Sequence, residues 1–164
     1  MRPFDAALIA ATFLCSLVAG LLFTFAVVAM PGIRKLDDGE FIRAFQSMDR
    51  VIQNNHPLFM LVWVGSVLAL AVAAVLGVRE LRGDVRLLLV GAAIAYVVGV
   101  QLPTAAVNIP LNNRLQALDV ATMSPADRMR ARGQFEPRWN RWNTLRAWCA
   151  GLTSMLLILV LFSE

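Results

Sequence analysis

The chain has 164 residues, and 59% of them are hydrophobic. A soluble domain is closer to half apolar, so this composition indicates a membrane protein, organised as one domain over residues 1–164. The formal net charge of +4 comes from basic residues that are almost all arginine. They form no basic run and have no interleaved aromatic residues, which argues against nucleic-acid binding. Attraction to anionic lipid headgroups explains the positive charge more simply.

Four apolar stretches are long enough to cross a hydrocarbon core of roughly 30 Å, which takes about 20 residues. They are residues 4–29, 57–78, 87–107 and 142–162. The first stretch is too long for a signal-peptide core and lacks a basic start followed by a cleavage site, so we expect it to be retained. Pro31 and Gly32 are expected to end its helix. The predicted fold class is all-α, an integral membrane four-helix bundle.

Small residues recur along the first three predicted helices at intervals of about one helical turn. They are Thr12, Ser16, Gly20 and Thr24 in the first, Gly65, Ala69, Ala73 and Gly77 in the second, and Gly91, Ala95 and Gly99 in the third. Such stripes let helices approach closely in lipid, where no hydrophobic force drives them together. We interpret them as packing surfaces between helices. They are also compatible with a homo-oligomer.

Two connecting segments are predicted to contain short helices. Asp37 or Asp38 can cap an amphipathic helix over residues 39–53, which lies in the membrane interface or folds back over the mouth of the bundle. Ser124 can cap a second helix, which ends near Gln134. In the first of these helices the apolar positions are Phe41, Ile42, Phe45, Met48 and Ile52, and the polar positions Gln46, Asp49, Arg50 and Gln53 fall on another face.

The distribution of basic residues predicts the orientation. With four crossings, the two termini share one side of the membrane with residues 79–86, and the two long loops share the other side. The long loops carry ten Lys and Arg residues, whereas the side with the termini carries four. The positive-inside rule therefore favours a cytoplasmic location for the long loops.

A group of polar and aromatic residues stands where the fourth apolar stretch begins. Trp139, Trp142, Asn143 and Arg146 share one face of a helix, and Arg146 lies about one turn inside the predicted span. A guanidinium at that depth is costly unless it is paired or hydrated, so an intramembrane arginine is a candidate functional residue. The alternative is that Arg146, being near a helix end, simply reaches back to the headgroups.

The third span and the start of the second supply further polar groups. Pro103 and Pro110 are expected to interrupt the third helix, and the carbonyl groups that they free need partners in protein or in a wet cavity. Chain parity places all of these groups at the end of the bundle that carries the long loops. The convergent set is Gln53, Asn54, Gln101, Asn108, Asn112, Trp139, Trp142, Asn143 and Arg146.

This convergent set predicts a small cavity with aromatic walls, several amide dipoles and one positive charge. Such a site suits a planar hydrophobic ligand, either an aromatic molecule or a lipid. Arg146 can hold a phenolate or enolate oxygen, and Asn108 and Asn143 can donate hydrogen bonds to it. The remaining members are expected to bind the substrate; they are Trp139, Trp142, Asn112, Gln101, Gln53 and Asn54.

Other kinds of site have little support. His56, the only histidine, is the obvious candidate proton acceptor near neutral pH, although an interfacial residue that merely begins a helix is the interpretation that we favour. Cys15 and Cys149 lie at depths that differ by roughly 10 Å, so we interpret them as unpaired apolar fillers. One histidine, two separated cysteines and no carboxylate cluster do not make a metal site. No cofactor is expected.

Two motifs resemble the anthrone oxygenase-like family of small four-helix membrane proteins. They are Asn108-Ile109-Pro110-Leu111-Asn112 and Trp139-x-x-Trp142-Asn143-x-x-Arg146. Similarity at residues 25–31 and at Gln53-Asn54 extends the likeness to nearly the whole chain. The resemblance carries over Asn108, Asn112, Trp142, Asn143 and Arg146 as site positions, but not His56. Most bacterial members are labelled only as a domain of unknown function.

The resemblance implies a multi-pass protein of the bacterial inner (plasma) membrane. Some fungal members are associated with oxidation of an anthrone to an anthraquinone by molecular oxygen, without metal or flavin. The function implied here is a cofactor-independent oxygenase that acts on an anthrone, a quinol or a related planar hydroxylated aromatic molecule. The alternatives are a non-enzymatic module that binds a lipid, a quinone or a partner protein through the same pocket, and a purely structural role in which the polar stripes join the helices.

Overall fold

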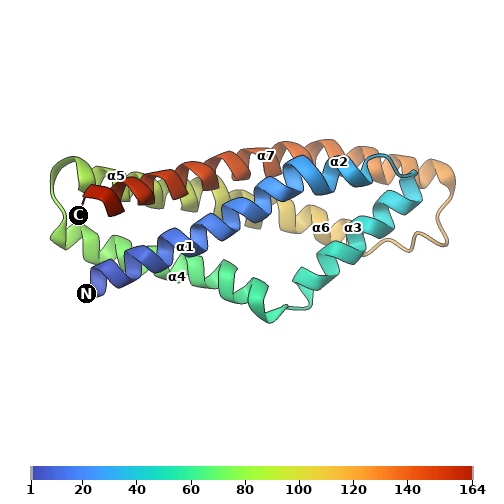
Figure 1. Ribbon diagram of the computed structural model, residues 1–164. Helices are drawn as coiled ribbons and strands as arrows, with labels where there is room; N and C mark the ends of the chain where they lie inside the picture. The colour runs from blue at the N-terminus through green and yellow to red at the C-terminus, as the bar shows by residue number, and fades with distance from the viewer. Residues whose placement is uncertain (1, 164) are drawn as a thin grey trace.

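The computed structural model describes residues 2–163, which form helices and short connections with no strand among them (Figure 1). Four helical segments in this range are long and apolar enough to cross a membrane. They are Pro3–Ile33, Pro57–Glu80, Gly83–Gln116 and Pro125–Ser163. The prediction of an all-α membrane bundle is confirmed, and the protein is a multi-pass membrane protein.

The helices are divided as follows. The first segment consists of α1 (Pro3–Thr24), the π-helical turn η1 (Phe25–Ala29) and α2 (Met30–Ile33). It is followed by α3 (Asp38–Gln53) and α4 (Pro57–Glu80), and the third segment consists of α5 (Gly83–Tyr96), η2 (Val97–Gln101), η3 (Thr104–Asn108) and α6 (Ile109–Gln116). The last helix is α7 (Pro125–Ser163).

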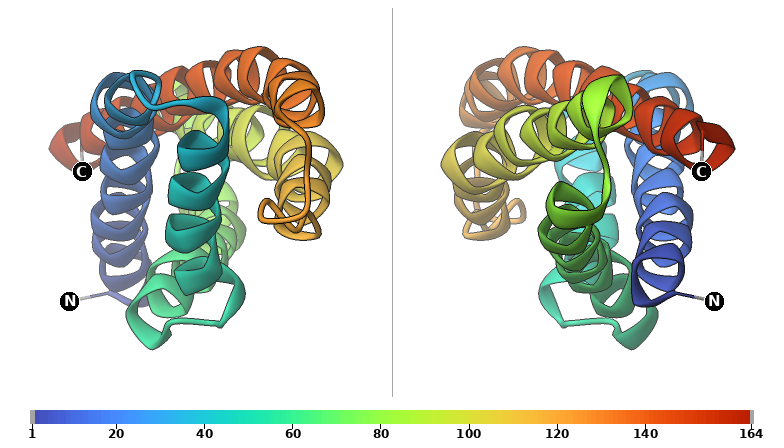
Figure 2. Two further views of the ribbon diagram at one scale, coloured as in Figure 1. Left: turned by 90° about the vertical axis from the view of Figure 1, so that its right-hand side faces the viewer. Right: turned by 90° about the vertical axis from the view of Figure 1, so that its left-hand side faces the viewer.

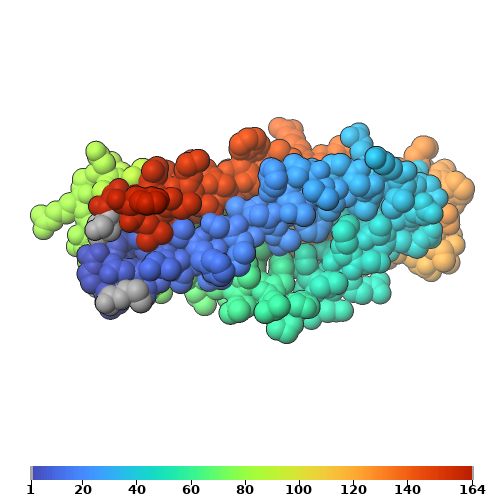
Figure 3. Space-filling view, viewed as in Figure 1, coloured from blue at the N-terminus to red at the C-terminus, as the bar shows by residue number. Residues whose placement is uncertain are grey.

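The two ends of the molecule differ in their connections between helices. Both ends of the chain lie beside the α4–α5 turn, and the connections α2–α3 and α6–α7 lie at the opposite end (Figure 1). Viewed from that opposite end, α2, α3, α6 and the first turns of α7 gather together (left panel of Figure 2). The ribbons leave an open V between α1 and the α3–α4 hairpin, but side chains fill most of it (Figure 3).

Two apolar clusters hold the helices together. The larger joins α1, α4, α5 and α7, with Phe4, Leu8, Tyr96 and Leu157 among its fully buried members. The smaller joins α2, α3, α6 and α7 at the end with the α2–α3 and α6–α7 connections, and its buried members are Met30, Phe41, Ile42, Phe45, Val107, Leu111, Leu115, Val120, Phe135 and Trp139. On α7 the larger cluster begins at Ala147 and the smaller ends at Trp142, so residues 143–146 fall between the two.

Pro31 does not end its helix as expected, and Pro103 and Pro110 interrupt the α-helical pattern of the third segment without ending the helix. Pro31, Pro103 and Pro110 each come two residues after a π-helical turn, namely η1, η2 and η3, and the helix continues beyond them. In each case the residue before the proline donates its N–H five residues back; Ile109, for example, donates to the carbonyl oxygen of Thr104. A proline ring normally clashes with the carbonyl four residues earlier. The wider π turn gives that carbonyl room, so the third segment extends to Gln116 rather than ending near residue 107.

Of the two helices predicted in the long loops, the first is confirmed as α3, and the second is much longer than expected. Asp37 caps α3 as predicted, since its Oδ1 accepts the N–H of Glu40 at 2.8 Å. α3 folds back over the bundle, because Phe41 and Phe45 are buried against α7. Ser124 Oγ accepts the N–H of Asp127 at 3.2 Å, but the helix that starts there does not end near Gln134. It runs on as α7 to Ser163, with Pro137 inside it.

One arginine ties the α2–α3 connection to α7. Arg132 donates to the backbone oxygens of Arg34 at 2.8 Å and Leu36 at 3.0 Å. It also forms ion pairs with Asp38 at 3.1 Å and with Glu136 at 2.8 Å. The Arg132 side chain is only 15% exposed, so these contacts are stronger than ordinary surface ion pairs, which contribute about 0–1 kcal/mol. This anchor fixes α3 over the end of the bundle.

The stripes of small residues include points of close approach, as Gly99 illustrates. A methyl group on Gly99 would lie 2.5 Å from Cys149 Sγ and 2.6 Å from Cys149 Cβ on α7, whereas one on Gly20 would have no neighbour within 4 Å. We predict that Gly99→Ala lowers the free energy of unfolding by about 1–3 kcal/mol, because α7 has to move. Gly20→Ala is the matched control and should leave the free energy of unfolding within about 0.5 kcal/mol.

Thermal unfolding of the detergent-solubilised variants, followed by circular dichroism, checks this prediction. Equal melting temperatures for the two variants would contradict it.

Candidate functional site

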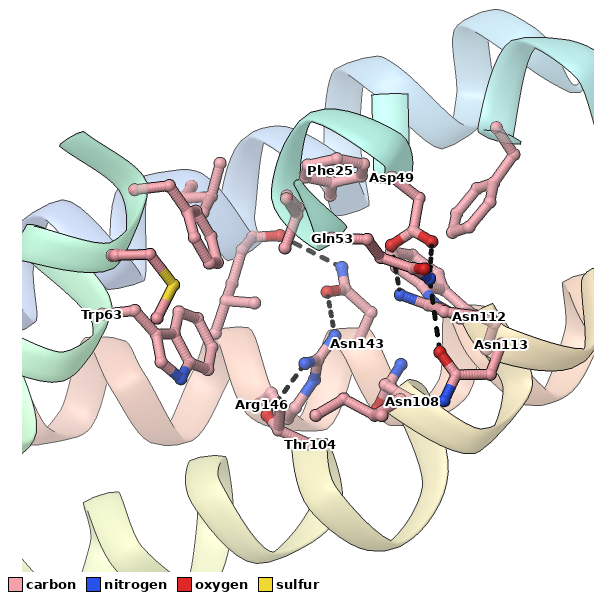
Figure 4. A pocket seen from close by; sticks show the side chains of 18 residues that line it. Phe25, Asp49, Gln53, Trp63, Thr104, Asn108, Asn112, Asn113, Asn143 and Arg146 are labelled. Carbon is pink, nitrogen blue, oxygen red and sulfur yellow. Dashed lines mark hydrogen bonds between the residues drawn. The ribbon is translucent and has the colours of Figure 1, made fainter. Parts of the chain in front are cut away.

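A cavity of about 330 Å³ lies where the two apolar clusters meet, between α1–η1, α3, the start of α4, η3–α6 and α7 (Figure 4). Its volume falls in the range of small-molecule sites. Its walls are mainly apolar, with the aromatic rings of Phe25, Phe45, Phe59, Trp63 and Trp139. Its polar members are Asp49, Gln53, Thr104, Asn108, Asn112, Asn113, Asn143 and Arg146.

Arg146 is the cation of the cavity. Its Nη1 donates to Thr104 Oγ1 and its Nη2 to Asn143 Oδ1, both at 2.9 Å, while its buried Nε has no hydrogen-bond partner. Within residues 2–163 no carboxylate forms an ion pair with it. The residue is 5% exposed and lies well inside α7, so the side chain does not reach back to the headgroups.

The surroundings of Arg146 only partly offset its burial. Removing an ion from water costs several kcal/mol in real proteins, and each hydrogen bond to a charged group returns about 1.5–3 kcal/mol. A guanidinium has five N–H donors, and these two bonds use two of them. The remaining donors favour an oxygen-bearing, electron-rich group in the cavity.

The two partners of Arg146 are themselves fixed by backbone. Thr104 donates to the carbonyl oxygen of Val100 at 2.7 Å, and Asn143 Nδ2 donates to the carbonyl oxygen of Leu22 on α1 at 3.1 Å. The guanidinium is therefore held in place from the first and third segments as well as from its own helix. A group fixed in this way needs little reorganisation when it binds a ligand oxygen.

Asn108 is the least satisfied residue of the site. It is 2% exposed, and neither its Oδ1 nor its Nδ2 has a hydrogen-bond partner. The close-up accordingly draws no bond to Asn108, in contrast to Asn143 and Asn112 (Figure 4). Buried amides are almost always hydrogen-bonded, so this unpaired amide beside a cavity makes the cavity's contents, whether water or a ligand, its candidate partner.

A second polar group surrounds Asp49 on α3. Asp49 Oδ1 accepts from Asn112 Nδ2 at 2.7 Å, and Oδ2 accepts from Gln53 Nε2 at 2.7 Å and from Gln116 Nε2 at 3.1 Å. Asn112 in turn accepts the indole N–H of Trp139 at 2.8 Å. Asp49 is 3% exposed and is balanced by neutral amides rather than by a basic residue.

Comparison of the sequence with known protein families points to the same residues. The sequence model described as anthrone oxygenase matches residues 48–156, which is more than half of the chain. The chain belongs to the anthrone oxygenase family. The matched region includes every polar residue of the cavity, from Asp49 to Arg146. Comparisons with curated proteins and with solved structures gave no match.

The structure brings together six of the ten site residues predicted for this member of the anthrone oxygenase family. These six line the cavity; they are Gln53, Asn108, Asn112, Trp139, Asn143 and Arg146. Trp142 packs against the smaller apolar cluster instead. Gln101 is outside the cavity, with a buried Nε2 that has no partner. Asn54 and His56 are exposed in the α3–α4 turn and do not line the cavity.

The predicted site omitted twelve of the residues that line this cavity, and Asp49, Phe59 and Trp63 show why. Asp49 was assigned only to the polar face of an amphipathic helix. A polar face usually contacts water, so the pattern gave no reason to expect that this one contacts amides of another helix. Phe59 and Trp63 looked like ordinary members of an apolar run. Their spacing of one helical turn was the available signal, since their rings stack at 5.6 Å with an interplanar angle of 15°.

The unequal bonding of two asparagines leads to a stability prediction. Asn108→Leu removes an amide that has no partner, so the free energy of unfolding should stay the same or rise by about 1 kcal/mol. Asn143→Leu removes the bonds to Leu22 and Arg146, so it should lower the free energy of unfolding by about 2 kcal/mol or more.

Thermal unfolding in the same detergent compares the two variants. Equal destabilisation by both would show that Asn108 is bonded within the protein and is not reserved for a ligand.

Proposed function

We propose that this protein is a cofactor-independent, oxygenase-like enzyme that acts on an anthrone, a quinol or a related planar hydroxylated aromatic molecule. The observation that carries the proposal is a buried, incompletely bonded guanidinium, Arg146, in the wall of an aromatic cavity beside the free amide of Asn108. Membership of the anthrone oxygenase family supports it.

The cavity suits both the flat aromatic rings and the oxygen atom of such a molecule. The rings of Phe25, Phe59, Trp63 and Trp139 offer apolar and π surface to flat aromatic faces. The free donors of Arg146 and the Asn108 amide suit one ring oxygen, and they favour it most when it is negatively charged. Interactions that strengthen as charge develops are those that accelerate a reaction.

The chemistry follows from the acidity of the substrate. Loss of a proton from the methylene carbon opposite the ketone of an anthrone gives an electron-rich enolate, which reacts directly with molecular oxygen. One oxygen atom becomes the new carbonyl of the anthraquinone, and the other leaves as water together with both methylene hydrogens. If Arg146 stabilises the enolate oxygen by ~3 kcal/mol, the enolate forms over a hundredfold faster.

We also propose a location for the reaction. The cavity lies in the half of the bundle that carries the α2–α3 and α6–α7 connections, where ten Lys and Arg residues are found. The positive-inside rule favours the cytoplasmic side for this end in a bacterial inner membrane. Leu58 and Leu61 on the first turns of α4 are 67% and 63% exposed, so lipid reaches the flank of the cavity. A hydrophobic substrate can then enter from the bilayer.

The function is tested by removing the cavity's positive charge. Arg146→Met should lower oxygen uptake with emodin anthrone at least ~100-fold, because the enolate loses its counter-charge. Its melting temperature should stay the same or rise, because an incompletely bonded buried charge is replaced by an apolar side chain. Arg141→Met is the matched control, since Arg141 is exposed on the same helix and does not line the cavity.

An oxygen electrode and anthraquinone absorbance follow the reaction in purified, detergent-solubilised protein. If no anthrone or quinol in a panel is oxidised faster by the wild type than by Arg146→Met, the oxygenase proposal is wrong. A lipid or quinone that co-purifies with the wild type, is lost in Asn108→Leu and is not consumed under oxygen would instead support the binding module.

A further inference from the structure

The cavity contains a carboxylate for which the proposed reaction has a use. Asp49 is the only acidic side chain among the residues that line the cavity within the described chain. It comes from α3, which reaches the cavity only because that helix folds back over the bundle. Enolate formation needs a proton acceptor within reach of the bound molecule, and His56 lies outside.

The hydrogen bonds of Asp49 leave one of its oxygens available. A carboxylate has about four lone-pair positions over its two oxygens. Oδ2 accepts two amide N–H groups, from Gln53 and Gln116, whereas Oδ1 accepts one, from Asn112. Oδ1 therefore keeps a lone pair. The three amides hold the carboxylate in a fixed orientation without an ion pair to neutralise it.

The cavity thus holds a buried anion and a buried cation that are not paired with each other. Arg146 is bonded to Thr104 and Asn143, and Asp49 is bonded only to amides. Asn112 and Trp139 connect the two ends: Asn112 bonds both Asp49 and the Trp139 indole, and the Arg146 guanidinium carbon lies 5.9 Å from the centre of the Trp139 ring. A molecule that gives up a proton at one end and gains negative charge at the other would complement this arrangement.

We propose that Asp49 is the catalytic base, and this inference rests on the proposed function. Asp49 Oδ1 takes a proton from the acidic carbon of the bound ring ketone. The C–H bond breaks, its electron pair delocalises on to the ketone oxygen, and Asp49 becomes a neutral carboxylic acid. Negative charge moves from Asp49, which has no cationic partner, to the ligand oxygen held by Arg146, and the net charge of the cavity does not change.

The test separates proton removal from oxidation. Under anaerobic conditions in D₂O, wild-type protein should catalyse exchange of the methylene hydrogens of emodin anthrone for deuterium, measured by mass spectrometry. Asp49→Asn should lower the catalysed exchange rate by a factor on the order of 10²–10⁴, as for loss of a general base. Arg146 is unchanged in this variant, so anthraquinone, which has no proton to lose, should still quench tryptophan fluorescence with a dissociation constant within about threefold of the wild-type value.

A matched control removes a neighbouring buried polar group from the same helix. Gln46 also lies on the buried face of α3 and donates to the carbonyl oxygens of Leu115 and Leu118, but it does not line the cavity. Gln46→Ala loosens the contact between α3 and α6 and leaves the carboxylate in place. It should retain exchange within about threefold of the wild-type rate, which a purely structural role for Asp49 does not predict.

The outcomes separate failure of this inference from failure of the proposed function. Wild-type exchange that persists in Asp49→Asn overturns the base assignment and leaves the oxygenase proposal standing. Wild-type protein that catalyses neither exchange nor oxygen uptake overturns both. If Asp49→Asn no longer binds anthraquinone, Asp49→Ala with added formate decides: restored exchange supports the assignment, because formate supplies the missing carboxylate, and no restoration overturns it.

Discussion

The arrangement of the candidate site depends on one guanidinium, Arg146, that is buried without an acid beside it. A charge in the low-dielectric interior of a bundle has to be solvated by fixed dipoles, and Arg146 obtains them from Thr104 on the third segment and from Asn143 on its own helix. Asn143 is in turn bonded to the backbone of α1. Three of the four long helical segments therefore contribute to the hydrogen bonds that hold the Arg146 side chain. An arrangement of this kind is hard to explain as packing alone, because an apolar residue would fill the same space at lower cost.

The polar group around Asp49 resembles that around Arg146, but its buried charge is negative. Asp49 is stabilised by three amides contributed by α3 and α6, and those bonds hold α3 against the bundle. The end of the molecule that carries the two long loops is thereby held together by two polar networks, one around Asp49 inside and one around Arg132 outside. In the proposed reaction, rigid placement of both charges is an advantage, because fixed dipoles need not reorganise when charge moves along a bound molecule.

The sequence predicts the spans well, because a hydrocarbon core imposes a minimum apolar length that is visible in any run of residues. It also predicts that Asn108, Asn112, Asn143 and Arg146 gather at one end, since chain parity and helical spacing suffice for that inference. Asp49 was beyond reach for a physical reason. An amphipathic pattern shows which face is polar, but not whether that face meets water or the amides of another helix. His56 illustrates the converse: its chemistry suggested a role, and tertiary structure left it exposed.

The two π turns of the third segment, η2 and η3, influence the direction in which its polar side chains point. A wide turn holds roughly one residue more than an α turn, so it rotates the helix beyond it by about 100° relative to an unbroken α-helix. Thr104 and Asn108 are the two ends of η3, and Asn112 lies just past it. The direction of these side chains around the helix axis thus depends on the π turns that precede Pro103 and Pro110. We infer that Pro103 and Pro110 help to set the direction of these side chains, so that replacing either proline would redirect a row of amides while leaving every one of them in place in the sequence.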